Sequence, residues 1–213
     1  MRLPSYYRRG FDTFLARFYD FIFAVEAFGM AKQLRYIILS KIPRKSRKLL
    51  DMATGSGAVA IEIKKKLPQA EAIGIDLSKA MLSIAKKKAI KEGLNVKFLK
   101  RNIEHTGFRK DYFDGITVSF GLHEIPRKNR LNVMKEAYRI TKKGGRFIIM
   151  DFSSPIGKIR QAMLAAHFGI LEPSYAKTIL KQDLAGELKE IKFHDVVKNN
   201  YFSGLIQTIE GVR

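Results

Sequence analysis

A glycine-rich loop follows a short apolar segment in the first third of the chain. The segment KLLDM (48–52) contains Asp51, and the loop GSGAVA (55–60) fits the pattern G-x-G-x-x-G/A. Loops of this kind join a buried strand to the start of a helix, where they hold the polar part of a nucleotide cofactor. The loop therefore predicts a cofactor site, and a nicotinamide dinucleotide and S-adenosylmethionine are the two cofactors to distinguish.

Two carboxylates favour S-adenosylmethionine. A diphosphate at the start of a helix needs bare amide N–H groups, and the nearby carboxylate of Asp51 would repel it. The ammonium group of S-adenosylmethionine would instead be attracted to Asp51. Asp76 ends the next apolar segment, EAIGID (71–76), 19 residues past Gly57. A carboxylate at that point can accept both hydroxyl groups of an adenosine ribose.

Apolar segments of strand length alternate with helical patterns from residue 48 onward, which is typical of a parallel sheet covered by helices. The predicted strands are 48–52, 71–76, 96–100, 113–120 and 145–152, and the predicted helices are 59–67, 79–93 and 127–141. Ser78 is placed to cap the second of these helices. The segments 194–202 and 204–212 predict an antiparallel hairpin that closes the sheet. We therefore expect a Rossmann-like, doubly wound α/β fold with a mostly parallel seven-stranded sheet.

The N-terminal region differs from this pattern because residues 11–39 are rich in aromatic side chains. They predict a helical cap over the carboxyl edge of the sheet, and the alternative is a lid that admits an apolar substrate or rests on a membrane. We expect one domain over residues 1–213. It comprises this cap (1–45), a cofactor-binding core (46–152), and substrate-side helices with the closing hairpin (153–213).

The composition excludes several kinds of chemistry. The chain has no cysteine, which removes disulfides, thiolate metal sites and cysteine nucleophiles. The four histidines show no metal-ligand spacing, and we expect no metal. The net charge of +20 attracts polyanions, either nucleic acid or an anionic membrane surface. The first ten residues carry no secretory pattern, and no apolar run approaches ~18 residues. We expect a cytoplasmic protein, with peripheral membrane contact as an extension of that prediction.

Four motifs carry a family resemblance. LLDMATGSG (49–57), IGIDLSKAML (73–82), FDGITVSFGLHEIP (113–126) and KKGGRFIIMDFSSP (142–155) resemble, in order and spacing, the class I S-adenosylmethionine-dependent methyltransferases. Within that class they are most similar to the UbiE-like ubiquinone/menaquinone-biosynthesis family. The resemblance implies a cofactor site with the following members: Asp51, Ala53, Gly55 and Gly57 at the methionine end, Asp76 and Leu77 at the ribose, Asn102 and Ile103 at the adenine, Ser119 and Phe120 beside the methyl group, and Tyr19 over the cofactor.

Methyl transfer from a sulfonium is an in-line displacement, and a base is needed only if the accepting atom must lose a proton. His123 and Glu124 follow the fourth strand and are the candidate base and its helper. The leading interpretation is methyl transfer to a small lipophilic or aromatic acceptor of the quinone-precursor type. The alternatives are an RNA or protein methyltransferase, which the basic charge favours, and a catalytically inactive cofactor-binding regulatory protein.

Overall fold

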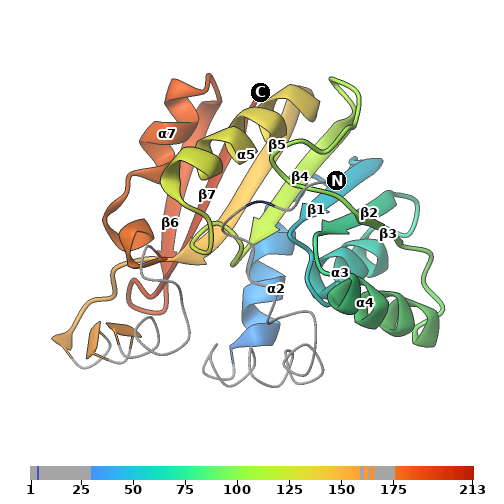
Figure 1. Ribbon diagram of the computed structural model, residues 1–213, viewed down its shortest axis with the longest axis horizontal. Coiled ribbons are helices and arrows are strands. Elements are labelled where there is room, and N and C mark those ends of the chain that lie inside the picture. Colours follow the sequence, from blue (N-terminus) through green and yellow to red (C-terminus); the bar gives the residue numbers. More distant parts are fainter. Residues whose placement is uncertain (1–3, 5–29, 159–160, 163, 166–175) are drawn as a thin grey trace.

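The computed structural model describes residue 4 and residues 30–158, 161–162, 164–165 and 176–213. Its centre is a seven-stranded sheet in the order β3-β2-β1-β4-β5-β7-β6 (Figure 1). The strands are β1 (Lys48–Met52), β2 (Glu71–Asp76), β3 (Lys97–Lys100), β4 (Phe113–Ser119), β5 (Thr141–Phe152), β6 (His194–Tyr201) and β7 (Ile206–Val212). The first five pair in parallel, whereas β7 is antiparallel to both β5 and β6. The predicted fold, including its closing hairpin, is confirmed.

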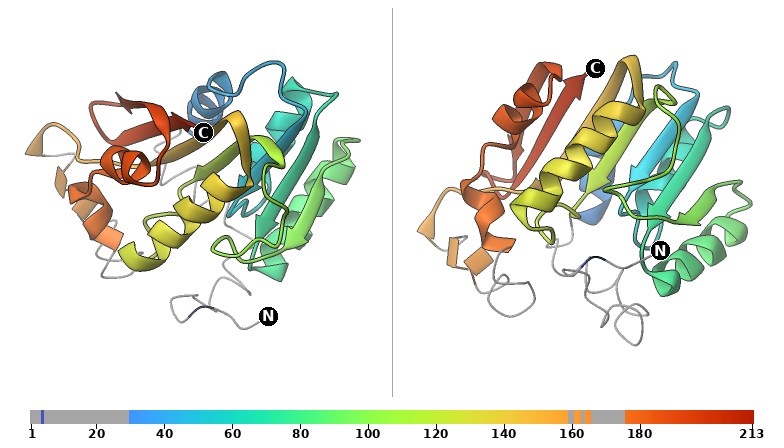
Figure 2. Two further views of the ribbon diagram at one scale, coloured as in Figure 1. Left: turned by 90° about the horizontal axis from the view of Figure 1, so that it is seen from above. Right: turned by 45° about the horizontal axis from the view of Figure 1, so that its top comes forward.

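Helices cover both faces of the sheet. They are α2 (Ala31–Ser40), α3 (Ala58–Lys66), α4 (Lys79–Lys91), α5 (Arg127–Ile140) and α7 (Leu184–Glu190), with a 3-10 helix η2 (Ala176–Lys181). Because crossovers between parallel strands are right-handed, α3 and α4 lie on one face and α5 lies on the other. Figure 2 shows α2 and α5 on opposite sides of the sheet. The chain adds strands toward one edge of the sheet from β1 and toward the other edge from β4. The crevice in which such folds bind ligands lies at this change in strand order.

Local signals in the sequence set most of these boundaries. The hydroxyl of Ser78 accepts a hydrogen bond from the amide of Met81 at 3.2 Å, as expected of a helix cap. The buried face of α4 consists of Met81, Leu82, Ala85 and Ala89. The predicted boundary at residue 141 is wrong, because α5 ends at Ile140 and β5 already begins at Thr141. Thr141 pairs with Phe113, and a register shift follows before the regular ladder of β5 resumes at Arg146.

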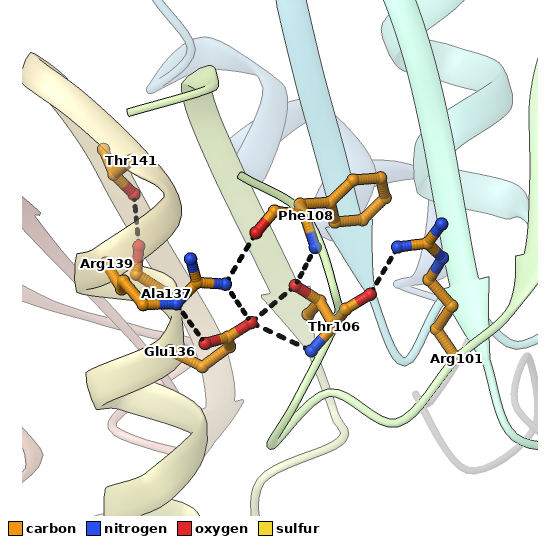
Figure 3. A network of polar contacts seen from close by, with 7 residues as sticks. All are labelled: Arg101, Thr106, Phe108, Glu136, Ala137, Arg139 and Thr141. Atoms are coloured by element: carbon orange, nitrogen blue, oxygen red, sulfur yellow. Dashed lines mark hydrogen bonds and ion pairs between the residues drawn. The ribbon is translucent and has the colours of Figure 1, made fainter. Parts of the chain in front are cut away.

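The loop between β3 and β4 is fixed to α5 by a polar network (Figure 3). Glu136 of α5 accepts hydrogen bonds from the amide and the hydroxyl of Thr106, at 2.9 and 2.6 Å. Arg139 binds the same carboxylate and donates to the carbonyl of Phe108 at 2.7 Å. Burial alone would raise the pKa of Glu136, but these donors lower it. The network holds in place the loop that contains the predicted adenine contacts.

The aromatic segment of the predicted cap, including Tyr19, lies outside the described residues. Of the predicted cap helices, α2 is described, and its buried residues Leu34, Ile38 and Leu39 join the main core. The predicted division of the domain therefore stays a prediction. Among the residues that the structure describes, no helix combines the length and apolar character needed to cross a bilayer.

Candidate cofactor and acceptor site

A cavity of about 540 Å³ lies where the glycine loop meets α2 and the end of β4. Four of the residues predicted at the methionine end and beside the methyl group line it, namely Ala53, Gly55, Ser119 and Phe120. Thr54 and Ser56 of the loop complete this part of its wall. The cavity therefore brings the loop that follows β1 together with the end of β4, although Ala53 and Ser119 are 66 positions apart in the sequence.

Asp51 lies beneath this cavity and does not line it. Its side chain is buried, and its two carboxylate oxygens accept hydrogen bonds from the hydroxyls of Thr54 at 2.6 Å and Thr117 at 2.8 Å. Thr117 is the neighbour of Asp51 in the parallel pairing of β1 and β4. Gly74 leaves room for this arrangement, because a Cβ there would lie 2.7 Å from the Thr54 hydroxyl. Asp51 is therefore connected to the cavity wall by its hydrogen bond with Thr54, a residue that the sequence analysis did not single out.

Burial also changes the protonation of Asp51. Desolvation raises its pKa to about 6, and the hydrogen bonds from Thr54 and Thr117 limit the rise. The nearby negative charge of Asp76 contributes to the rise. Asp51 is therefore mainly ionised at neutral pH, as its predicted attraction for an ammonium group requires.

The amide groups of the glycine loop are already used within the protein. The N–H of Thr54 donates to the carbonyl of Ile75 at 2.9 Å, and that of Gly57 donates to the carbonyl of Thr54 at 2.9 Å. The N–H of Gly55 donates to a carboxylate oxygen of Asp76 at 2.8 Å. A diphosphate bound here would have to displace these bonds and would face two carboxylates. The loop therefore fits a cofactor with a cationic, phosphate-free end.

The other oxygen of Asp76 accepts from the amide of Ser78 at 2.9 Å, so its carboxylate ties the loop to the start of α4. A carboxylate has lone pairs beyond these two, and ribose hydroxyls can still donate to it. Asn102 stands at the start of the following loop, where its side-chain oxygen accepts from the amide of Glu104 at 2.9 Å. Leu77 is half-buried and Ile103 is buried. Neither these two residues nor Asn102 lines the described cavity.

Two residues at the crevice adopt left-handed backbone angles although they are not glycine. Ala53 follows β1 with φ +53°, and Phe120 follows β4 with φ +52°. Each such residue costs on the order of 1 kcal/mol or more, and positions of this kind concentrate at binding sites. Gly121 allows the two turns to meet, because a Cβ on it would lie 2.8 Å from the Cβ of Ala53.

His123 is buried beside Asp151, which the sequence analysis missed. The Nδ1 atom of His123 lies 2.7 Å from a carboxylate oxygen of Asp151. The other oxygen of Asp151 accepts from the amides of Leu122 and His123, at 3.1 and 3.2 Å. Asp151 therefore holds the imidazole of His123 from the side of Nδ1, and the helper role expected of Glu124 stays a prediction. A single acidic residue inside the apolar segment FIIMDF (147–152) is the signal that could have identified it.

Aromatic rings connect His123 to the cavity wall. The ring of His123 packs edge-on against Phe152 at 5.1 Å, and Phe152 packs against Phe120 at 5.2 Å. Phe120 lines the cavity, whereas His123 lies one ring further away. Within the described part of the chain, no group of three or more metal-ligating side chains comes together.

The strand order and the glycine loop with its carboxylates define the class of protein. The fold is that of the Rossmann-like S-adenosylmethionine-dependent methyltransferases, such as a structure from Archaeoglobus fulgidus (TM-score 0.70, 15% identity, 92% of this chain and all of that chain covered). The chain belongs to the ubiE/COQ5 methyltransferase family, whose model matches residues 8–194. This membership confirms the resemblance inferred from the motifs.

Two curated relatives illustrate the similarity. The ubiquinone/menaquinone biosynthesis C-methyltransferase UbiE of Geotalea daltonii is 36% identical over 149 residues, 68% of this chain. The demethylmenaquinone methyltransferase of Thermus thermophilus is 33% identical over 141 residues, 64% of this chain. The match spans 62% of the length of each of these relatives.

Proposed function

We propose that this chain transfers a methyl group from S-adenosylmethionine to a small, lipophilic aromatic acceptor of the quinone-precursor type. The observation that carries the proposal is the cavity itself, which joins the glycine loop to the aromatic ring of Phe120 at the end of β4. The names of the relatives from Geotalea daltonii and Thermus thermophilus, which refer to quinone biosynthesis, support this choice of acceptor.

The residues of this chain divide the work between binding and proton transfer. Asp51, acting through Thr54, and Asp76 bind the two polar ends of the cofactor. The cofactor supplies a methyl group on a positively charged sulfur, which leaves as a neutral thioether. A ring carbon that accepts the methyl group must lose a proton, and the proposal assigns that proton to Nε2 of His123. Asp151 favours this tautomer, because an imidazole that donates from Nδ1 carries its lone pair on Nε2.

The lipophilic nature of the proposed acceptor and the basic charge of the protein both favour methyl transfer at a membrane surface. Tyr36 of α2 and Ile90 of α4 are 75% and 78% exposed, and α2 carries two basic residues and α4 five. A lipophilic acceptor would reach the site from the bilayer, and the net charge of +20 would favour anionic lipid. Glu124 is half-buried next to His123 and stays a candidate helper in the proton transfer.

Transfer of labelled methyl groups tests the proposal. The protein is incubated with methyl-labelled S-adenosylmethionine and a cell extract, which is then separated into lipid, RNA and protein. A second assay presents a reduced demethylmenaquinone in anionic or in zwitterionic vesicles. We expect label in the lipid fraction and faster transfer in anionic vesicles. Label in RNA or protein would contradict the proposed acceptor, and the absence of transfer to all three fractions would favour the inactive alternative.

The variant His123→Ala tests the assignment of the base. We expect it to lower turnover at least ~100-fold, since general base catalysis contributes about that much. Binding of S-adenosylhomocysteine, measured by calorimetry, should change less than about twofold, because His123 does not line the cavity. A variant with full turnover would remove His123 from the mechanism and leave the rest of the proposal intact.

A further inference from the structure

The methionine end of the proposed cofactor carries a carboxylate as well as an ammonium group, and the glycine loop offers little to an anion. The amides of Thr54, Gly55 and Gly57 already donate to acceptors within the protein. The carboxylates of Asp51 and Asp76 make the surroundings of the loop negative. A bound α-carboxylate therefore needs a cation from another element of the fold.

Arg35 of α2 faces the same cavity as the glycine loop. It lines the cavity together with Ala31, Leu34 and Ile38, which lie one helical turn or less away on the same side of α2. The residue is half-buried, and within the described part of the chain its guanidinium has no hydrogen bond or ion pair. A half-buried guanidinium without a counter-charge is suited to hold a carboxylate through two parallel hydrogen bonds.

The acidic residues of the cavity do not neutralise Arg35. Glu62 of α3 and Glu92, which follows α4, both line the cavity. Both bind the same ammonium group, that of Lys65, at 2.9 and 2.5 Å. Lys91 also lines the cavity, at the end of α4 and next to Glu92 in the chain. Among the described residues that line the cavity, the cations therefore outnumber the carboxylates, and Arg35 is the lining cation on α2.

We propose that Arg35 binds the α-carboxylate of the methionine end of S-adenosylmethionine. The inference rests on the proposed function, because it assumes that this cofactor occupies the glycine loop. It assigns a residue of the helix before β1 to cofactor recognition. It also divides the recognition of the zwitterionic tail between two elements, with the ammonium group facing the side of Asp51 and Thr54, and the carboxylate facing α2.

A pair of cofactors that differ only at this group gives a direct test. Decarboxylated S-adenosylmethionine lacks the α-carboxylate and keeps the ammonium, the sulfonium and the adenosine. Calorimetry gives the dissociation constant of each cofactor for the wild type and for Arg35→Gln. We expect the substitution to reduce the preference for S-adenosylmethionine over its decarboxylated form by at least about 10-fold, the effect of losing a charge-assisted pair. Arg35→Lys keeps the charge and loses the forked guanidinium, so its preference for S-adenosylmethionine should lie between those of the wild type and Arg35→Gln.

Lys91→Gln is the matched control, because it removes another cation from the wall of the same cavity. It should leave the preference unchanged within about twofold. If Lys91→Gln lowers the preference and Arg35→Gln does not, the assignment to Arg35 is overturned while the proposed cofactor stands. If the wild type binds neither form, the proposed function itself fails. Circular dichroism of each variant checks that α2 and the rest of the fold are retained.

Discussion

The buried carboxylate of Asp51 should make the protein less stable at neutral pH than at acid pH. Its pKa rises from 3.8 to about 6 on folding, mainly because burial removes the carboxylate from water. Between these two values the native state holds a proton that the unfolded state releases. The contribution of Asp51 to the free energy of unfolding therefore falls as the pH rises through this window. With about 1.4 kcal/mol per pKa unit, the full loss is about 3 kcal/mol.

The variant Asp51→Asn removes this titration and isolates its effect. Urea unfolding of wild type and variant, without cofactor, gives the difference in unfolding free energy at each pH. Integrated over the two pKa values, about 2 kcal/mol of change should develop between pH 4.5 and 7.5, in favour of the variant. The lost or rearranged bonds to Thr54 and Thr117 shift the difference by a constant, so the slope with pH is the quantity to compare. A slope of zero would show that Asp51 titrates normally and would refute this account of the site.

Asp114 provides the control of opposite sign. Although its partial burial would raise the pKa, the ammonium of Lys142 and the amides of Arg47 and Lys48 lower it. The wild type should therefore gain stability over Asp114→Asn as the pH rises through the acid range. Asp51→Asn should also bind S-adenosylmethionine on the order of 10-fold more weakly at pH 7.5, since it removes the charge that attracts the ammonium group. A more stable protein with a weaker cofactor site is the expected combination.

Two further substitutions test the packing of the loop and the geometry around His123. Gly57→Ala should destabilise the protein by about 3 kcal/mol in urea unfolding, since φ is +80° and the new Cβ would lie 2.8 Å from Phe98. At Gly93, φ is +65° and a new Cβ would meet open space, so Gly93→Ala should lower the free energy of unfolding by only about 1 kcal/mol. A loss equal to that of Gly57→Ala would contradict the packing argument. Asp151→Asn should cost about 2–4 kcal/mol in urea unfolding and lower kcat, because the buried imidazole of His123 loses the carboxylate that orients it. Full turnover in this variant would show that Asp151 does not position His123 for the reaction.

The fold could be predicted because its signals are local and agree with one another. The apolar segments that form β1 and β2 begin and end at the predicted residues. The capping hydroxyl of Ser78 and the apolar face of α4 were also visible in the sequence. The junction between α5 and β5 was not, because the pairing of Thr141 with Phe113 depends on a strand 28 residues earlier. The glycines predict a turn at 144–145, and the chain does leave the regular ladder between Thr141 and Arg146, with Gly144 at φ +75°.

The candidate site was predicted in its residue types and less well in its contacts. Asp51 was expected to face the cofactor, but the pairing of β1 with β4 places it against Thr117, below the loop. Glu124 was named as a possible helper of His123, and the contact of His123 with Asp151 of β5 was not predicted. Both the Asp51–Thr117 and the His123–Asp151 contacts join segments that are distant in sequence. A pattern read along one segment cannot contain such contacts, since the register between strands is set by the whole sheet.

The amides of the glycine loop already form hydrogen bonds within the protein, and in the proposed complex the recognition of the cofactor is therefore divided among separate elements. Once the amides of Thr54, Gly55 and Gly57 serve the fold, the loop contributes shape and close approach more than hydrogen bonds. Charge must then come from side chains that the fold holds nearby: Arg35 of α2 lines the cavity, and Asp51 of β1 lies beneath it, hydrogen-bonded to Thr54 of the wall. In the proposed complex, the carboxylate below the loop would repel phosphate and the guanidinium on α2 would attract a carboxylate, so that together they would select a zwitterionic tail. Removal of either charge should therefore weaken the discrimination between cofactors more than it disturbs the fold.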